Sequence, residues 1–110
     1  MMSGARHYLY VIRPTRVGML VEGPTDAESA VLTRHFEYLE HLVQEGVVLM
    51  AGRTLHSDER AFGMVVLAAD TEAGAERVMR EDPAVAEGVM IAELHPYRVS
   101  LWAQDARPAS

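Results

Sequence analysis

Cysteine is absent from the 110 residues of this chain. Its absence excludes disulfide bonds, thiolate catalysis and zinc or iron–sulfur sites built on cysteine. Clustered basic residues are lacking as well, because the net charge is −6 and no two Lys or Arg residues are adjacent. Nucleic-acid binding requires a positive surface that follows the phosphate backbone. We therefore expect no nucleic-acid partner.

A long apolar run is the third missing feature. No uncharged stretch approaches the roughly 20 residues that span a bilayer, and the N-terminal residues do not have the apolar core of a signal peptide. We expect a cytoplasmic protein with no membrane partner. The hydrophobic share of 49% is typical of a folded globule, and the length suits one domain. We expect an ordered core over about residues 7–102 and a frayed polar tail over 103–110.

The hydrophobic pattern changes several times between a period of two and one of 3.6, which indicates mixed α and β structure. A capping box of Thr25 and Glu28 predicts a helix that starts near Asp26, and Gly46 is a natural stop for it. Asp70 is the expected cap of the second helix. We predict strands at 7–14, 47–52 and 61–69 and a last one from about 89 to 102. We predict helices at 26–45 and 71–81. The predicted connections are a segment at 16–24, a hairpin at 53–60, and a tight turn or single helical turn at 82–88.

The resulting order is β-α-β-β-α-β, which predicts an α+β, ferredoxin-like fold with both helices on one face of a four-stranded antiparallel sheet. In the first strand Tyr8, Tyr10 and Ile12 point one way, while Leu9 and Val11 point the other. Both faces of this sheet are apolar, yet two helices cover only one of them. We therefore predict a homodimer packed through its sheet faces. The alternative is a monomer whose tail and residues 18–23 fold under the sheet.

Two histidines lie on the first helix. At ~100° per residue, His35 falls among the apolar positions, and His41 lies on the opposite face with Glu37 one turn before it. We interpret His41 as a surface residue. An unpartnered buried imidazole costs about 1–3 kcal/mol, so His35 needs a hydrogen-bond partner and is either a satisfied core residue or a functional one. The apolar positions of this face are Leu32, Phe36, Leu39, Leu42 and Val43.

Asp82 is the candidate partner of His35. With Pro83 behind it, Asp82 is also a typical N-cap, since the carboxylate accepts orphan amides and proline lacks the one that would be wasted. It precedes the strand that neighbours the first strand in this topology. Spacing alone does not establish the contact. If the two side chains meet, the carboxylate would fix one imidazole tautomer and leave the other nitrogen to move protons.

Other polar residues offer weaker candidates. Arg53 either attracts an anionic substrate or is a solvated residue of the hairpin, and Tyr10 and Tyr38 either line a pocket or belong to the core. The hairpin residues His56, Asp58 and Glu59 have a composition common in polar turns, so we predict no metal site. His7 and His95 are interpreted as edge residues.

Several segments together resemble the YciI-like (YCII-related) family. They are "YLYVIRP", "RHFEYLEHLVQEG", "AG" at the end of the second strand, "FGMVVLAA" and "EDPAVAEGVMIAELHPYRV". The resemblance implies a ferredoxin-like fold, a dimer of the dimeric α/β barrel type, and an active-site pocket centred on a His/Asp pair, which falls on His35 and Asp82. Members often have Ala-Gly-Pro where this chain has Ala51-Gly52-Arg53.

Two functions stay open at this stage. The first is a small enzyme without a cofactor in which His35, oriented by Asp82, transfers a proton on a small organic substrate, either an anionic organic acid or a cyclic compound, as in isomerase, lyase or dehydrochlorinase chemistry. The inward position of His35 and the family resemblance motivate it. The resemblance implies relatives in the dimeric α/β barrel class, which include lactone isomerases, dehydrochlorinases and cofactor-independent monooxygenases. The second is a homodimer that binds a small ligand or assists another enzyme, with the His/Asp pair serving the fold alone.

Overall fold

The computed structural model describes residues 6–103. Of the predicted tail 103–110, residues 104–110 lie outside the described part of the chain. The elements, in chain order, are β1 (Arg6–Pro14), α1 (Gly18–Val21), α2 (Asp26–Gln44), β2 (Val48–Arg53), β3 (Gly63–Ala69), α3 (Glu72–Glu81), α4 (Pro83–Ala86) and β4 (Met90–Tyr97).

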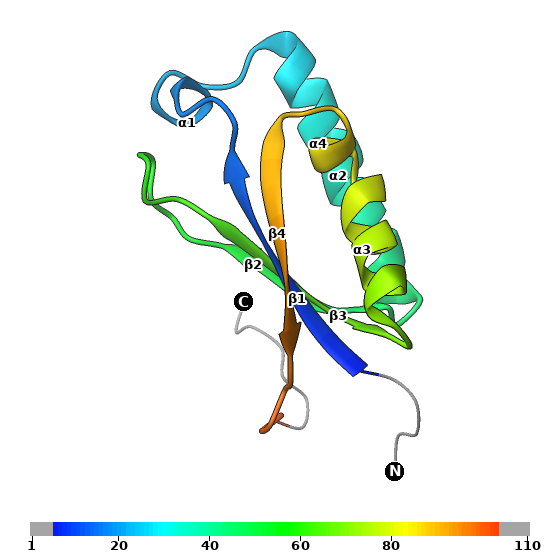
Figure 1. Ribbon diagram of the computed structural model, residues 1–110. Coiled ribbons are helices and arrows are strands. Elements are labelled where there is room, and N and C mark those ends of the chain that lie inside the picture. Colours follow the sequence, from blue (N-terminus) through cyan, green and yellow to red (C-terminus); the bar gives the residue numbers. More distant parts are fainter. Residues whose placement is uncertain (1–5, 104–110) are drawn as a thin grey trace.

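The four strands form one sheet in the order β2-β3-β1-β4, and every neighbouring pair is antiparallel. Helices α2, α3 and α4 lie together on one side of this sheet (Figure 1). The α+β, ferredoxin-like prediction is thereby confirmed. The first and last strands lie side by side at one edge of the sheet, because β1 pairs with β4 from His7 opposite Tyr97 to Pro14 opposite Met90.

The side-chain alternation predicted for β1 is confirmed. Tyr8, Tyr10 and Ile12 are buried in the core between sheet and helices, together with Leu39 of α2. This core is closed by Val48, Val65, Leu67, Ala75 and Met79.

The predicted capping box of α2 is present. The Thr25 hydroxyl accepts a hydrogen bond from the Glu28 amide at 3.1 Å, and the Glu28 carboxylate accepts one from the Thr25 amide at 2.9 Å. The helix ends as expected beside Gly46, which has φ +77° and so suits a residue without Cβ. Both signals are local, which is why the sequence predicted the helix well.

The cap of α3 was predicted wrongly. Thr71, not Asp70, is the N-cap residue, and its hydroxyl accepts a hydrogen bond from the Gly74 amide at 3.0 Å. Threonine and aspartate are both good N-caps, so two adjacent candidates could not be ranked by residue type. The helix therefore begins one residue later than predicted, at Glu72.

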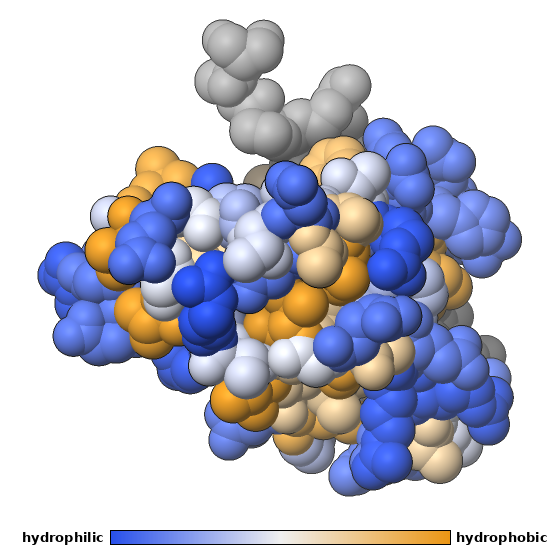
Figure 2. All heavy atoms as spheres, turned by 90° about the horizontal axis from the view of Figure 1, so that it is seen from above, coloured by the Kyte–Doolittle hydropathy of each residue, from blue (hydrophilic) through white to orange (hydrophobic). Residues whose placement is uncertain are grey.

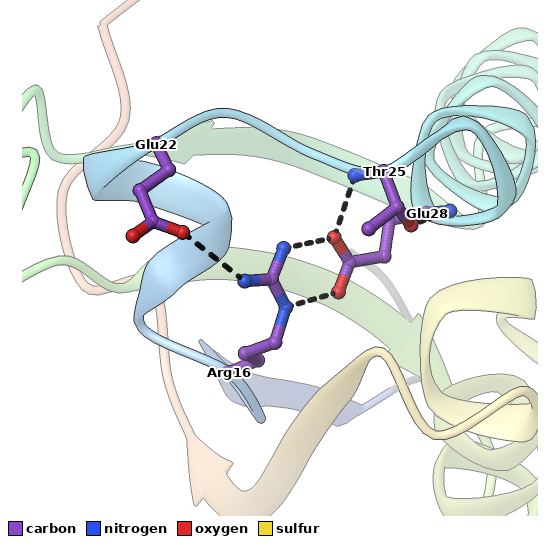
Figure 3. A network of polar contacts seen from close by, with 4 residues as sticks. All are labelled: Arg16, Glu22, Thr25 and Glu28. Carbon is purple, nitrogen blue, oxygen red and sulfur yellow. Dashed lines mark hydrogen bonds and ion pairs between the residues drawn. The ribbon is translucent and has the colours of Figure 1, made fainter.

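The connection after β1 contains a helical turn that the sequence did not predict, α1. Its Met19 is buried. Arg16 ties the segment to α2, donating two hydrogen bonds to the Glu28 carboxylate at 2.9 and 2.6 Å, and lies 3.9 Å from Glu22 (Figure 3). Glu28 thus closes the capping box and holds α1 at once.

The last strand stops earlier than predicted. It ends at Tyr97, and residues 98–103 are not strand. The Val99 amide donates to Nδ1 of His7 at 3.1 Å, so the chain beyond β4 stays close to the start of β1. β4 is an edge strand, as expected for His95 and Pro96, because an edge tolerates a residue that cannot donate.

One face of the sheet has no helix over it. Residues opposite to the core-facing ones lie there, among them Ile91 and Met50, which are 63% and 46% exposed. The alternative in which residues 18–23 cover this face is wrong for α1, because Met19 lines a cavity together with the core-facing Ile12. None of the helices between residues 6 and 103 combines the length and apolar character that a membrane crossing needs.

Candidate active site

Asp82 sits at the junction of two helices. It is the C-cap of α3 and the N-cap of α4. Pro83 lies in the first turn of α4, and the Ala84 amide donates a hydrogen bond to Oδ1 of Asp82 at 3.0 Å. The capping prediction is correct. The side chain is completely buried, so a cap that would usually face water is turned into the protein.

His35 meets Asp82 across 47 residues of sequence. Its Nδ1 lies 2.7 Å from Oδ1 of Asp82, and 15% of its side chain is exposed. Oδ1 also accepts from Ala84, and a carboxylate is an acceptor only. Nδ1 is therefore the protonated nitrogen, and Nε2 of the neutral ring keeps a lone pair for a proton from elsewhere.

Tyr10 is a third partner that the sequence did not connect to this pair. Its hydroxyl donates to Oδ2 of Asp82 at 2.8 Å, and the tyrosine is fully buried. Burial, and next to it the negative charge of Asp82, raises the pKa of Tyr10 far above its usual range. The phenol thus stays protonated and donates throughout the physiological range.

A cavity of about 700 Å³ opens beside His35. Most of its wall is apolar and comes from the ends of β1 and β2, from α1, and from the middle of α2. Seen from above, the surface has a hollow with hydrophobic side chains at its centre and hydrophilic ones around it (Figure 2). Pockets of this size and character bind small organic molecules in many proteins. Lining residues from these elements include Ile12, Met19, Leu32, Phe36 and Ala51, and Phe62, which directly precedes β3, lies beside them.

Two further ionisable side chains lie on this wall. Arg53, at the end of β2, and Glu40 of α2 are both exposed and both line the cavity. Within residues 6–103, neither has a salt-bridge partner. The cavity therefore offers one imidazole, one guanidinium and one carboxylate within an apolar surface.

The structure places neither predicted tyrosine on the cavity wall. The Tyr10 hydroxyl donates a hydrogen bond to Asp82. The Tyr38 hydroxyl donates one to the Val78 carbonyl at 2.7 Å, and this bond joins α2 to α3. Burial, together with the charges of Asp82 and Glu81, raises the pKa of Tyr38 to about 12. Both are donors to protein groups, so we assign neither to substrate contact.

The apolar stripe of α2 is wider than its buried part. Phe36 and Val43, which the sequence grouped with the core positions, are 66% and 49% exposed and line the cavity instead. The exposed His41 pairs with Glu45 at 3.2 Å and not with Glu37. Both partners are one turn away from His41, so the spacing allowed either.

The hairpin between β2 and β3 behaves as a polar turn. Asp58 accepts hydrogen bonds from Arg60, which holds the pKa of Asp58 down at about 2. Among residues 6–103, no group of three or more His, Asp or Glu side chains could hold a metal ion.

The model of the YCII-related domain matches residues 8–98 of this chain. The chain belongs to this family. The YCII-related assignment agrees with the resemblance read from the sequence segments. The curated proteins include no match to this chain.

A solved structure of the same fold gives a comparison for the YCII-related chain. It is 5-chloro-2-hydroxyhydroquinone dehydrochlorinase (TftG) from Burkholderia phenoliruptrix AC1100 in complex with 2,5-dihydroxybenzoquinone. The TM-score is 0.60 at 17% identity, over 83% of this chain and 93% of that one. The two proteins share a fold over most of their lengths.

Proposed function

We propose that this protein is a small enzyme in which His35, held by Asp82, transfers a proton on a small organic anion bound in the cavity. The reaction class is isomerisation or elimination, of which dehydrochlorination is one example. Nε2 takes a proton from a carbon or hydroxyl group of the substrate. The Asp82 carboxylate stabilises the imidazolium that forms. In isomerisation the imidazolium returns the proton to another atom of the same molecule. In elimination the electron pair of the broken C–H bond forms a new double bond as the leaving group departs, chloride in a dehydrochlorination, and the imidazolium then loses its proton to water.

One observation carries this proposal: Nδ1 of His35 is bonded to a buried carboxylate at 2.7 Å while the same ring lines the cavity. The bond selects the tautomer whose free lone pair is on Nε2. It also fixes the ring plane, so little reorganisation is needed when the proton moves. A histidine with only a structural role would not have to lie on the wall of a cavity.

The apolar wall and Arg53 support an anionic substrate with an apolar body. A guanidinium beside low-dielectric surface binds a carboxylate or phenolate more strongly than it would in water. The related fold of TftG, whose name describes elimination of chloride from a hydroquinone, makes chlorinated hydroxyquinols a sensible first group of test compounds, followed by lactones and small unsaturated acids.

Substrate screening followed by three variants tests the proposal. His35→Ala should lower kcat/KM by roughly 10²–10⁴, the usual contribution of a positioned general base. Asp82→Asn should lower it by a similar factor, because the amide no longer stabilises the imidazolium. His41→Ala is the matched control on the same helix, and its activity should equal that of the wild type. Activity that survives both His35→Ala and Asp82→Asn would disprove the proton-transfer role.

A second candidate is a non-catalytic protein that binds a small ligand. The two other bonds of Asp82, to Ala84 and Tyr10, support it, because they stabilise the fold without involving the cavity. In that case both His35→Ala and Asp82→Asn would lower the melting temperature, and no compound of the panel would be turned over. Ligand affinity would then be the property that Arg53 and His35 control.

We also propose that the chain forms a homodimer through the helix-free face of its sheet. The exposure of Ile91 and Met50 on that face supports this, since water contact with an apolar sheet face is unfavourable. Light scattering after size exclusion should give twice the mass of one chain, and Ile91→Lys should give a monomer. Leu55→Lys, on the hairpin at 87% exposure, should stay dimeric. A monomeric wild type would contradict this proposal.

A further inference from the structure

The two oxygens of Asp82 have different donors. Oδ1 accepts from the Ala84 amide at 3.0 Å and from His35 Nδ1 at 2.7 Å, whereas Oδ2 accepts from the Tyr10 hydroxyl at 2.8 Å. A carboxylate held at one oxygen alone can still rotate about its Cβ–Cγ bond, since this torsion is broad. The bond at Oδ2 removes that freedom.

We propose that Tyr10 is a positioning residue, whose hydroxyl fixes the plane of the Asp82 carboxylate so that Oδ1 stays directed at His35. Its effect on catalysis rests on the function proposed above. Its effect on the His35 ring does not, because it follows from the hydrogen bonds alone. The sequence suggested Tyr10 for substrate contact, and this proposal gives it a different role.

The location of Tyr10 suits a fixed donor. It lies in the middle of the central strand β1, where its backbone is paired with Val65 on one side and Leu94 on the other. The side chain is completely buried and outside the cavity lining. The ring therefore cannot turn toward a ligand, and its hydroxyl cannot exchange its partner for water.

The protonation state of Tyr10 points the same way. Its pKa lies far above the usual range, mainly because of burial and also because Asp82 is negatively charged. Tyr10 thus donates one hydrogen bond and is not an acid or base in the reaction. It acts on His35 only through the carboxylate.

Nuclear magnetic resonance of the imidazole tests this directly, without any substrate. In the wild type we expect the Nδ1 proton of His35 to give a downfield resonance protected from solvent. Tyr10→Phe should shift or broaden this resonance and speed its exchange by roughly fivefold or more, the factor that corresponds to losing one hydrogen bond. Tyr38→Phe removes a different phenol hydroxyl, on the same helix α2 as His35 but bonded to the Val78 carbonyl, and should leave the resonance unchanged. An unchanged His35 resonance in Tyr10→Phe would overturn the proposal.

A second variant covers the case in which Tyr10→Phe does not fold. Site-specific 3-fluorotyrosine at position 10 keeps the hydroxyl but makes it a stronger donor. The His35 Nδ1 resonance should move in this protein and should not move with 3-fluorotyrosine at position 38. The same resonance in both proteins would count against the role of Tyr10.

Kinetics then separate this inference from the proposed function. Where the panel yields a substrate, Tyr10→Phe should lower kcat by up to about a hundredfold, the cost of misplacing a catalytic group, with KM within twofold. An unchanged kcat would overturn the catalytic part of the inference. If the panel yields no turnover, the proposed function fails while the resonance still decides whether Tyr10 positions the pair.

Discussion

Asp82 accepts three hydrogen bonds within 3.0 Å, and none of its side chain reaches solvent. A buried carboxylate is tolerated only when donors replace the water that it loses. The partners come from β1, α2 and α4, so one residue connects three elements that are distant in sequence. Removing it leaves the Tyr10 hydroxyl and the His35 ring without their acceptor and α4 without its cap.

Asp82→Ala should therefore destabilise the protein by about 2–4 kcal/mol, the sum of a lost N-cap and an unsatisfied buried donor. Urea unfolding monitored by circular dichroism measures this. Asp70→Ala is the control, since Asp70 is exposed and does not cap α3; its effect should lie within about 0.5 kcal/mol. Equal effects of the two substitutions would contradict this account.

At the scale of elements, Glu28 joins α1 to α2. It accepts hydrogen bonds from Arg16 and from the Thr25 backbone, and these lower the pKa of Glu28 to about 2. A carboxylate with a lowered pKa in the folded protein contributes stability above its unfolded pKa, and this contribution is lost as the pH falls through the folded value. The junction should thus weaken between pH 4.5 and about 2.

Glu28→Gln should remove this part of the acid dependence. The stability of the variant should change less than that of the wild type between pH 4.5 and 2, because the amide carries no charge for Arg16 at any pH. Thermal unfolding over a pH series gives the comparison. Glu37→Gln, an exposed position on the same helix, should follow the wild-type curve; a Glu28→Gln curve that also follows it would refute the linkage.

The elements were predictable where the signal is local. The Thr25 and Glu28 box and the Asp82-Pro83 cap involve residues within a single turn, so the sequence identified both. The N-cap of α3 was assigned to Asp70 and not to Thr71 because both residue types are good caps. Which of two adjacent residues caps a helix is decided by the backbone conformation, which the sequence does not show. The α1 turn was missed because the three apolar residues Met19 to Val21, next to Gly18, are too few to show a clear period.

The site was predictable only in part, for a different reason. The inward side of α2 could be calculated from its periodicity, and this placed His35 correctly. The contacts of Asp82 with His35 and Tyr10 join residues 47 and 72 positions apart, and no local rule connects such distances. In the sequence, Tyr10 also occupies an inward position of a strand, where a tyrosine that only packs in the core would give the same pattern.

At the scale of the whole molecule, several elements that are separate in sequence form the wall of the cavity. Arg53 comes from the end of β2 and His35 from the middle of α2, and α1 adds Met19 to the wall. No single element forms a binding surface. A ligand that contacts all three elements binds the folded chain and not the unfolded one, so it should stabilise the fold.

A bound anion should accordingly raise the melting temperature, by the equivalent of about 2.7 kcal/mol at a ligand concentration of 100 times Kd. Arg53→Met should reduce this shift for anionic compounds and leave it unchanged for neutral analogues of the same shape. Arg60→Met is the control, because Arg60 is paired with Asp58 outside the cavity lining. A shift that is the same in Arg53→Met and the wild type would show that Arg53 does not bind the anion.

Asp82 both caps a helix and accepts a hydrogen bond from the imidazole, so Asp82 and His35 should differ in how well they tolerate mutation. In a library selected only for soluble expression, aspartate should persist at position 82, since it caps α4 and accepts the hydrogen bond of the buried Tyr10. His35, partly exposed and with a partner that keeps its other donors, should drift freely. Of these two positions, only position 35 should become more restricted when selection for activity is added, so the histidine is the member of the pair whose tolerance reports on chemistry.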